Sequence, residues 1–94
     1  MKNYLPIRFF RKQFDVLLVS EARVYGPSSM TIEANETPKE FAERINKIFD
    51  RLLERDFYGM KAKLYYSVIT YGEITLRLYP DGKIEKFETH LGLF

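Results

Sequence analysis

Tyrosine, lysine and arginine side chains gather between residues 61 and 87 at a spacing typical of a binding surface. Successive side chains of a strand point to opposite faces, so residues of one parity share a face. Tyrosine and arginine often anchor protein interfaces, and rings beside cations can also stack bases and neutralise phosphates. This chemistry indicates recognition of a partner. The predicted Tyr/Lys/Arg face carries Lys61, Lys63, Tyr65, Arg77, Tyr79 and Phe87, with Ser67 and Thr75 between them.

The turns between the strands decide which side chains share this face. If Gly72 closes a three-residue hairpin loop, Val68 faces Ile74 in an apolar row, and Tyr65, Tyr79 and the cations lie on the opposite face. A two-residue Gly72-Glu73 turn would shift the pairing and mix apolar with polar positions. We therefore expect the three-residue loop. The same register pairs Tyr66 with Leu76 and Leu64 with Leu78.

A second turn follows at residues 79–83. Pro80 suits the second position of a type I turn, and Gly82 suits the left-handed position after it. This turn predicts that Arg77 pairs with Glu85 and that Phe87 joins the Tyr/Lys/Arg face. It also pairs Leu78 with Ile84.

A second cationic group, Arg8, Arg11 and Lys12, lies among aromatic residues near the start of the chain. These cations could bind phosphates or an acidic protein surface. They could equally remain in solvent and protect an edge strand from unwanted pairing. In a further alternative, apolar residues of this segment cover the Tyr/Lys/Arg face and bury Tyr65 and Phe87 in a second small core. Those apolar residues are Ile7, Phe9, Phe10 and Phe14.

Capping residues predict a helix over residues 37–56. Thr37 suits the N-cap, Pro38 the first helical position, and Glu40 the return bond of a capping box. Apolar side chains then recur at the helical period on one stripe, as in a helix that lies on a sheet. Before the helix, residues 13–24 indicate a strand buried on both faces near its middle, with a helix as the alternative. A turn at 25–29 and a strand at 30–34 would complete a hairpin.

These elements predict one α+β domain spanning residues 1–94. We expect a four- to five-stranded, mainly antiparallel sheet in the order β-β-α-β-β-β, with one amphipathic helix packed on one face. Residues 1–12 are expected to be an extended edge segment and could add a strand. The predicted core comprises Val16, Leu18, Ile32, Phe41, Ile45, Ile48, Phe49, Leu52, Leu64, Val68, Ile74, Leu76 and Leu78.

Several kinds of chemistry are not expected from this composition. The chain has no cysteine and only one histidine, His90, so neither disulfides nor a zinc site is expected. No serine lies in a nucleophile motif and the glycines form no phosphate-binding loop, so we predict neither an enzyme nor a cofactor. The net charge of +2 is too mild to predict a polyanionic partner by itself. No apolar run is long enough for a membrane span, and a cytoplasmic location is the default expectation.

The sequence therefore favours a small non-enzymatic protein-binding module, such as an adaptor, regulator or inhibitor. Its partner would be another protein or a second copy of itself, held through the Tyr/Lys/Arg face. The alternative is a nucleic-acid-binding accessory protein that uses the same face together with Arg8, Arg11 and Lys12. No membrane or metal partner is expected.

Overall fold

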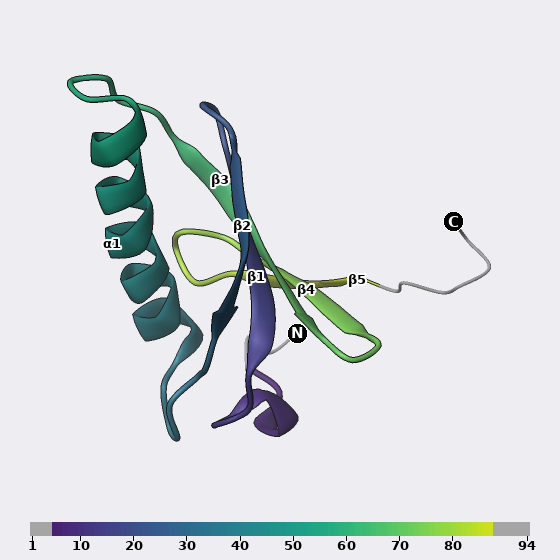
Figure 1. Ribbon diagram of the computed structural model, residues 1–94. Helices are drawn as coiled ribbons and strands as arrows, with labels where there is room; N and C mark the ends of the chain where they lie inside the picture. The colour runs from purple at the N-terminus through teal and green to yellow at the C-terminus, as the bar shows by residue number, and fades with distance from the viewer. Residues whose placement is uncertain (1–4, 88–94) are drawn as a thin grey trace.

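A five-stranded antiparallel sheet covered on one face by a helix makes up the part of the chain that the computed structural model describes, residues 5–87 (Figure 1). The strands lie in the order β2-β1-β3-β4-β5 across the sheet. The predicted α+β class and the element order β-β-α-β-β-β are confirmed. The elements are a short 3-10 helix η1 (Ile7–Phe9), β1 (Phe14–Ser20), β2 (Val24–Met30), α1 (Pro38–Asp56), β3 (Leu64–Tyr71), β4 (Ile74–Leu78) and β5 (Ile84–Phe87).

Helix α1 begins as its capping residues predict. The Thr37 hydroxyl accepts a hydrogen bond from the Glu40 amide at 3.1 Å, and the Glu40 carboxylate accepts one from the Thr37 amide at 2.9 Å. Both satisfy amide groups that have no partner inside the helix. The helix ends at Asp56, as expected.

The core lies between α1 and the sheet. Most of the predicted core residues are buried there, while Ile48, Leu52 and Ile74 pack against it only partly buried. Val68 is the exception, because it lies on the face of β3 that points away from α1. The buried hydrophobic residues are Leu5, Phe9, Phe14, Val16, Leu18, Tyr25, Ile32, Phe41, Ala42, Ile45, Phe49, Leu53, Leu64, Ile69, Leu76 and Leu78.

The N-terminal segment closes one end of this core. Phe9 is fully buried, and its ring centroid lies 5.4 Å from those of both Phe14 and Tyr71. Phe10 bridges to Ile32, and no described residue before β1 belongs to a named strand. The alternative in which this segment covers the Tyr/Lys/Arg face is therefore wrong. Its aromatic residues extend the core on the helix side of the sheet.

The first hairpin turns earlier than its glycine and proline indicate. The turn lies at residues 21–23, where the Ser20 hydroxyl accepts hydrogen bonds from the amides of Ala22 and Arg23 and donates one to the Arg23 carbonyl. A serine side chain can replace the backbone bonds of a turn in this way. The predicted turn at 25–29 instead lies inside β2, where its pairing with β1 shifts register. The predicted strand at 30–34 is wrong, since β2 ends at Met30.

The register between β3 and β4 also differs from the prediction. Gly72 and Glu73 form a two-residue turn, and Gly72 has the positive φ of +60° that a tight hairpin turn requires at its first central position. Val68 therefore pairs with Arg77, not with Ile74, while Ser67 pairs with Leu78. This register differs from the predicted one by three residues, an odd number, so it places Ser67, only 1% exposed, under α1 and removes it from the Tyr/Lys/Arg face. It likewise pairs Ile69 with Leu76.

The turn between β4 and β5 is as predicted. The Gly82 amide donates to the Tyr79 carbonyl at 2.9 Å, and the Tyr79 amide donates to the Lys83 carbonyl at 2.9 Å. Arg77 pairs with Glu85, and Leu78 pairs with Ile84.

Candidate functional site

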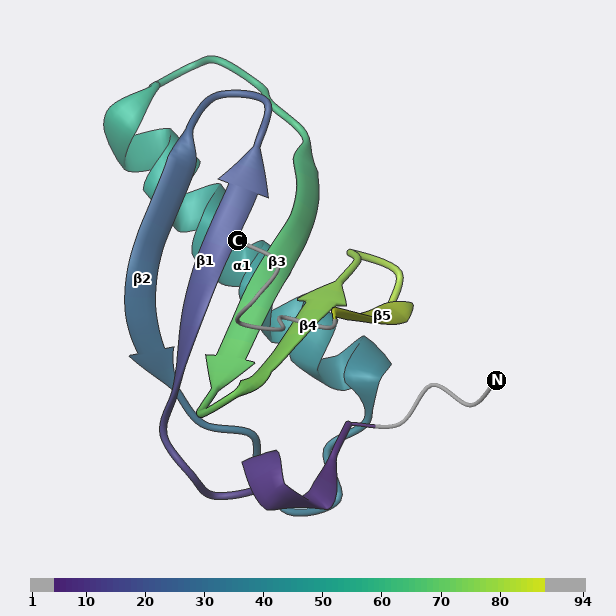
Figure 2. The same cartoon turned by 90° about the vertical axis from the view of Figure 1, so that its right-hand side faces the viewer.

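The sheet face opposite α1, here called the open face, is not covered by any other element of residues 5–87. Figure 2 shows this face toward the viewer, with α1 behind the sheet. The strand register orders its side chains in three rows across the sheet. The upper row contains Val24, Val19, Tyr66, Tyr79 and Lys83, the middle row Leu17, Val68, Arg77 and Glu85, and the lower row Ser29, Asp15, Thr70 and Thr75.

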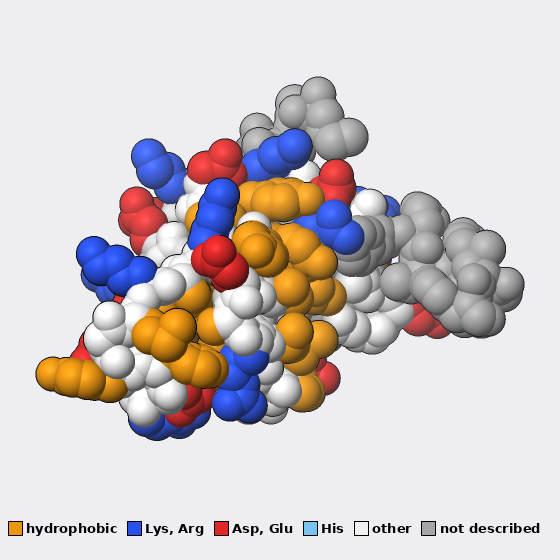
Figure 3. All heavy atoms as spheres, turned by 90° about the horizontal axis from the view of Figure 1, so that it is seen from above, with side chains coloured by type: hydrophobic (Ala, Val, Ile, Leu, Met, Phe, Trp, Pro, Cys, Tyr) orange, Lys and Arg blue, Asp and Glu red, His pale blue; other side chains and the backbone are white. Residues whose placement is uncertain are grey.

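The apolar side chains of the open face are contiguous. They occupy the upper and middle rows over β2, β1 and β3, and Val24 is 51% exposed while the others are partly exposed. Figure 3 views the molecule from the end at which α1 finishes, and shows hydrophobic side chains in a band with charged side chains around it. We call the contiguous apolar side chains of the open face the apolar block: Leu17, Val19, Val24, Tyr66 and Val68.

A polar network borders the apolar block over β4 and β5. The Arg77 guanidinium lies 4.4 Å from the centre of the Tyr66 ring, and its Nη1 donates to the Tyr79 hydroxyl at 3.2 Å and to the Glu85 carboxylate at 3.1 Å. The Tyr79 hydroxyl in turn donates to Glu85 at 3.1 Å. Lys83 lies 5.4 Å from the Tyr79 ring centre. Arg77, Tyr79, Lys83 and Glu85, here called the tyrosine–arginine cluster, contact one another beside Tyr66 of the apolar block.

Within this cluster, the opposite charges of Arg77 and Glu85 offset each other. The hydrogen bond between Arg77 and Tyr79 raises the pKa of the guanidinium above its ordinary value, so Arg77 stays protonated at any accessible pH. Glu85 offsets that charge at hydrogen-bonding distance. A positive charge over a ring adds roughly 0.5–1 kcal/mol at an exposed site. The Arg77–Glu85 pair is therefore balanced within the chain, unlike a free cationic patch.

The structure separates the predicted basic residues. Lys61 and Lys63 are exposed in the loop before β3, at the end of the sheet near the end of α1. Residues 8–12 lie at the opposite end, around η1 (Figures 1 and 2). Arg8, Arg11 and Lys12 therefore do not extend the Tyr/Lys/Arg face.

The aromatic members of the prediction also occupy distinct positions. Tyr65 is 44% exposed at an irregularity of β3, between the residues that pair with Val19 and Ser20. Phe87 is the last residue of β5 and pairs with Thr75 in the lower row. Its side chain, like His90, lies outside the described part of the structure.

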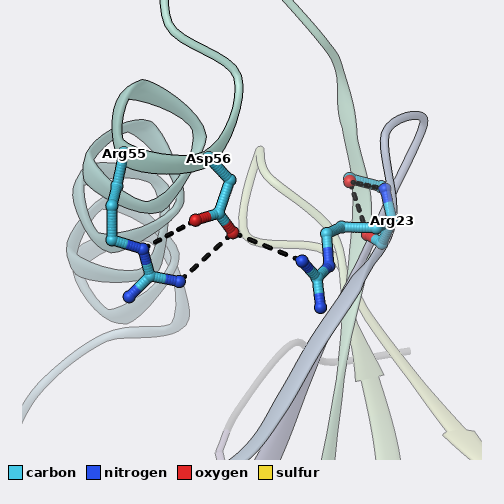
Figure 4. Close-up of polar contacts among 4 residues, drawn as sticks. Arg23, Arg55 and Asp56 are labelled. Atoms are coloured by element: carbon cyan, nitrogen blue, oxygen red, sulfur yellow. Dashed lines mark hydrogen bonds and ion pairs between the residues drawn. The ribbon is translucent and has the colours of Figure 1, made fainter.

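Near Lys61 and Lys63, an ionic cluster joins the end of α1 to the first hairpin (Figure 4). Arg55 contacts the Asp56 carboxylate at 2.7 Å, and Arg23 contacts it at 3.4 Å. The hydrogen bond from Arg55, with the charge of Arg23, holds the pKa of Asp56 below its ordinary value. Burial, with the charge of Asp56, raises the pKa of Tyr25. Arg23 and Arg55 thus serve the fold and offer less free charge to a polyanion.

A shallow hollow beside the start of α1 contains several acidic residues. Glu36 receives two hydrogen bonds from Arg44 at 2.8 Å, and Arg44 also donates to the Thr31 carbonyl at 2.7 Å. Glu40 belongs to the capping box. These carboxylates already hold the helix and the preceding loop together, so they are not free to act as a poised acid and base. Glu33, Ala34 and Asn35 complete the lining.

Sequence reasoning missed Leu17, Val19 and Val24 as surface residues. The signal was present, because both parities of residues 16–19 are apolar, which indicated a strand buried on both faces. Only one parity is buried under α1. The other parity contributes to the apolar block.

No protein-family model matches this chain, and no curated protein or solved structure is significantly similar to it. Within residues 5–87, no helix is both long and apolar enough to cross a membrane. Over the same range, no three His, Cys, Asp or Glu side chains are grouped so that they could hold a metal ion. The residues of the open face therefore provide the basis for a functional proposal.

Proposed function

We propose that this chain is a non-enzymatic protein-binding module whose open face docks a protein partner, in the manner of an adaptor, regulator or inhibitor. The observation that carries the proposal is the apolar block beside the tyrosine–arginine cluster. Protein interfaces typically combine an apolar centre with tyrosine and arginine anchors and a polar rim. The three rows of the open face have this composition.

The charges of the open face favour a protein over a nucleic acid. Asp15 and Glu85 would both repel phosphates, and Glu85 already neutralises Arg77. A single-strand binder instead needs a cationic groove that follows the backbone. The other predicted cations lie at the two ends of the sheet and do not form such a groove with Arg77.

Site-specific photocrosslinking in the native host tests this proposal, because it captures whichever protein lies on the open face. A benzophenone amino acid replaces Tyr66 in the apolar block or, as the matched control, Tyr58, which is 84% exposed in the loop after α1. We expect a discrete protein adduct from position 66 and none of that mass from position 58. Equal or absent adducts at the two positions would contradict a docking role for the open face.

A labelled single-stranded oligonucleotide, titrated at several salt concentrations, tests the nucleic-acid alternative. Phosphate contacts release counterions, so such binding falls steeply as salt rises. We expect no binding. Salt-sensitive binding that a charge reversal at Arg77 weakens would support the alternative and count against a protein partner.

A further inference from the structure

We infer that the partner docked on the open face is a second copy of this chain, with the two apolar blocks packed against each other. This inference rests on the proposed function and identifies its partner. In a two-fold dimer the same patch serves both subunits, so the patch must be compatible with itself in shape and in charge. The open face meets both conditions.

The charges of the open face are self-compatible. Its described charged side chains are Asp15, Glu85, Arg77 and Lys83, two of each sign, and the Arg77–Glu85 pair is neutralised within one subunit. The apolar block itself carries no charge. Asp15 lies in the lower row, and Arg77 lies over β4 at the border of the block. Two blocks can therefore meet without burying an unpaired charge, which would be costly.

The shape of the block also suits a copy of itself. Val19, Val24 and Val68 are β-branched residues on neighbouring strands, and Leu17 lies between them. Two sheets pack face to face at about 10 Å when apolar side chains of similar height interdigitate. A two-fold axis in the interface would place one block on the other and leave the tyrosine–arginine clusters at the rim.

The neighbouring sheet edge favours this face-to-face arrangement. β2, which carries Val24 of the apolar block, is an edge strand of the sheet. It contains Pro27, which has no amide hydrogen to donate to a further strand. Its pairing with β1 also shifts register between Val16 and Leu18. Both features discourage addition of another strand to this edge. A second copy is therefore expected on the face of the sheet and not as a continuation of it beyond β2.

The size of the face predicts a reversible dimer. Five strands at about 4.8 Å and three rows at about 6.8 Å give the whole open face an extent of roughly 24 by 20 Å, or about 480 Å², which is an upper limit for the area that two apolar blocks can share. Stable interfaces typically bury about 800 Å² on each partner. We therefore expect a dissociation constant in roughly the micromolar range or weaker.

Sedimentation equilibrium of the purified chain tests the inference. The mass of the wild type should rise from 11.2 kDa toward twice that value as concentration increases. Leu17→Arg should weaken association at least about tenfold, because it places charge at the centre of the interface. Ser29→Arg, which adds the same side chain to the exposed polar lower row, should retain it. If Leu17→Arg does not fold, Val24→Arg, at a more exposed position of the apolar block, is tested in its place.

Several outcomes would overturn the dimer. These are a monomeric wild type throughout the concentration range, equal weakening by Leu17→Arg and Ser29→Arg, or association that high salt abolishes. A monomer that still gives a Tyr66 photoadduct with a different protein would refute self-association alone. The absence of any adduct at position 66 would instead refute the proposed function.

Discussion

Placing the same charged residue at two adjacent positions of β3 tests the strand register on which the open face depends. Ser67 is buried between Leu18 and Leu78 under α1, whereas Val68 faces away from α1 and pairs with Leu17 and Arg77. Ser67→Asp should therefore destabilise the fold far more than Val68→Asp. A three-residue loop at Gly72 would reverse this order.

The expected magnitudes differ severalfold. Burial raises the pKa of an aspartate by roughly 3–5 units from about 3.9. The buried acid of Ser67→Asp must stay protonated at about pH 7, roughly three pH units above its unfolded pKa of about 3.9. At about 1.4 kcal/mol for each pH unit, this costs roughly 4 kcal/mol of folding free energy. Val68→Asp loses strand propensity and some apolar contact, about 1 kcal/mol. A domain of 94 residues has roughly 5–14 kcal/mol of stability in total.

Urea denaturation followed by circular dichroism measures both variants at neutral and mildly acidic pH. The deficit of Ser67→Asp should shrink as pH falls, because a folded-state pKa above the unfolded value favours the folded, protonated acid. The deficit of Val68→Asp should stay small. If Val68→Asp is the less stable variant, the register between β3 and β4 is wrong, and with it the composition of the open face.

Two further predictions concern the turns and the helix end. Gly82 has a φ of +96°, and a Cβ there would lie 3.0 Å from the Lys39 Cα, so Gly82→Ala should lower the free energy of unfolding by about 2 kcal/mol or more. Gly72→Ala, with open space around it, should lower it by roughly 1 kcal/mol. Equal shifts of the melting temperature for the two variants would contradict the contact between Gly82 and α1. Asp56→Asn should lower the free energy of unfolding at neutral pH, because it removes a carboxylate that the folded state stabilises in its ionised form. This stabilisation is complete above the ordinary pKa of 3.8 and is lost as pH falls through the lower pKa of the folded state. Urea midpoints of wild type and Asp56→Asn should therefore converge in strong acid, and a constant difference at every pH would assign the effect to something other than the Arg55–Asp56–Arg23 cluster.

Local sequence determined the elements whose signals lie within a few residues of one another. Thr37, Pro38 and Glu40 specify the start of α1, because their hydrogen bonds span only three residues. Pro80 and Gly82 likewise fix the second turn and the pairing of β4 with β5. The α+β fold class followed from these signals and from the apolar periodicity.

Only the tertiary structure decided which face of the sheet α1 covers. Ser67 is buried because its position lies under α1, although a local pattern prefers Val68 for the core. An irregularity at Tyr65 returns Leu64 to the core side, so no single parity describes β3. When a strand has apolar residues at both odd and even positions, the alternation of side chains does not show which of its two faces is buried. Contacts between residues distant in the sequence make that choice, and they leave the apolar block on the face that α1 does not cover.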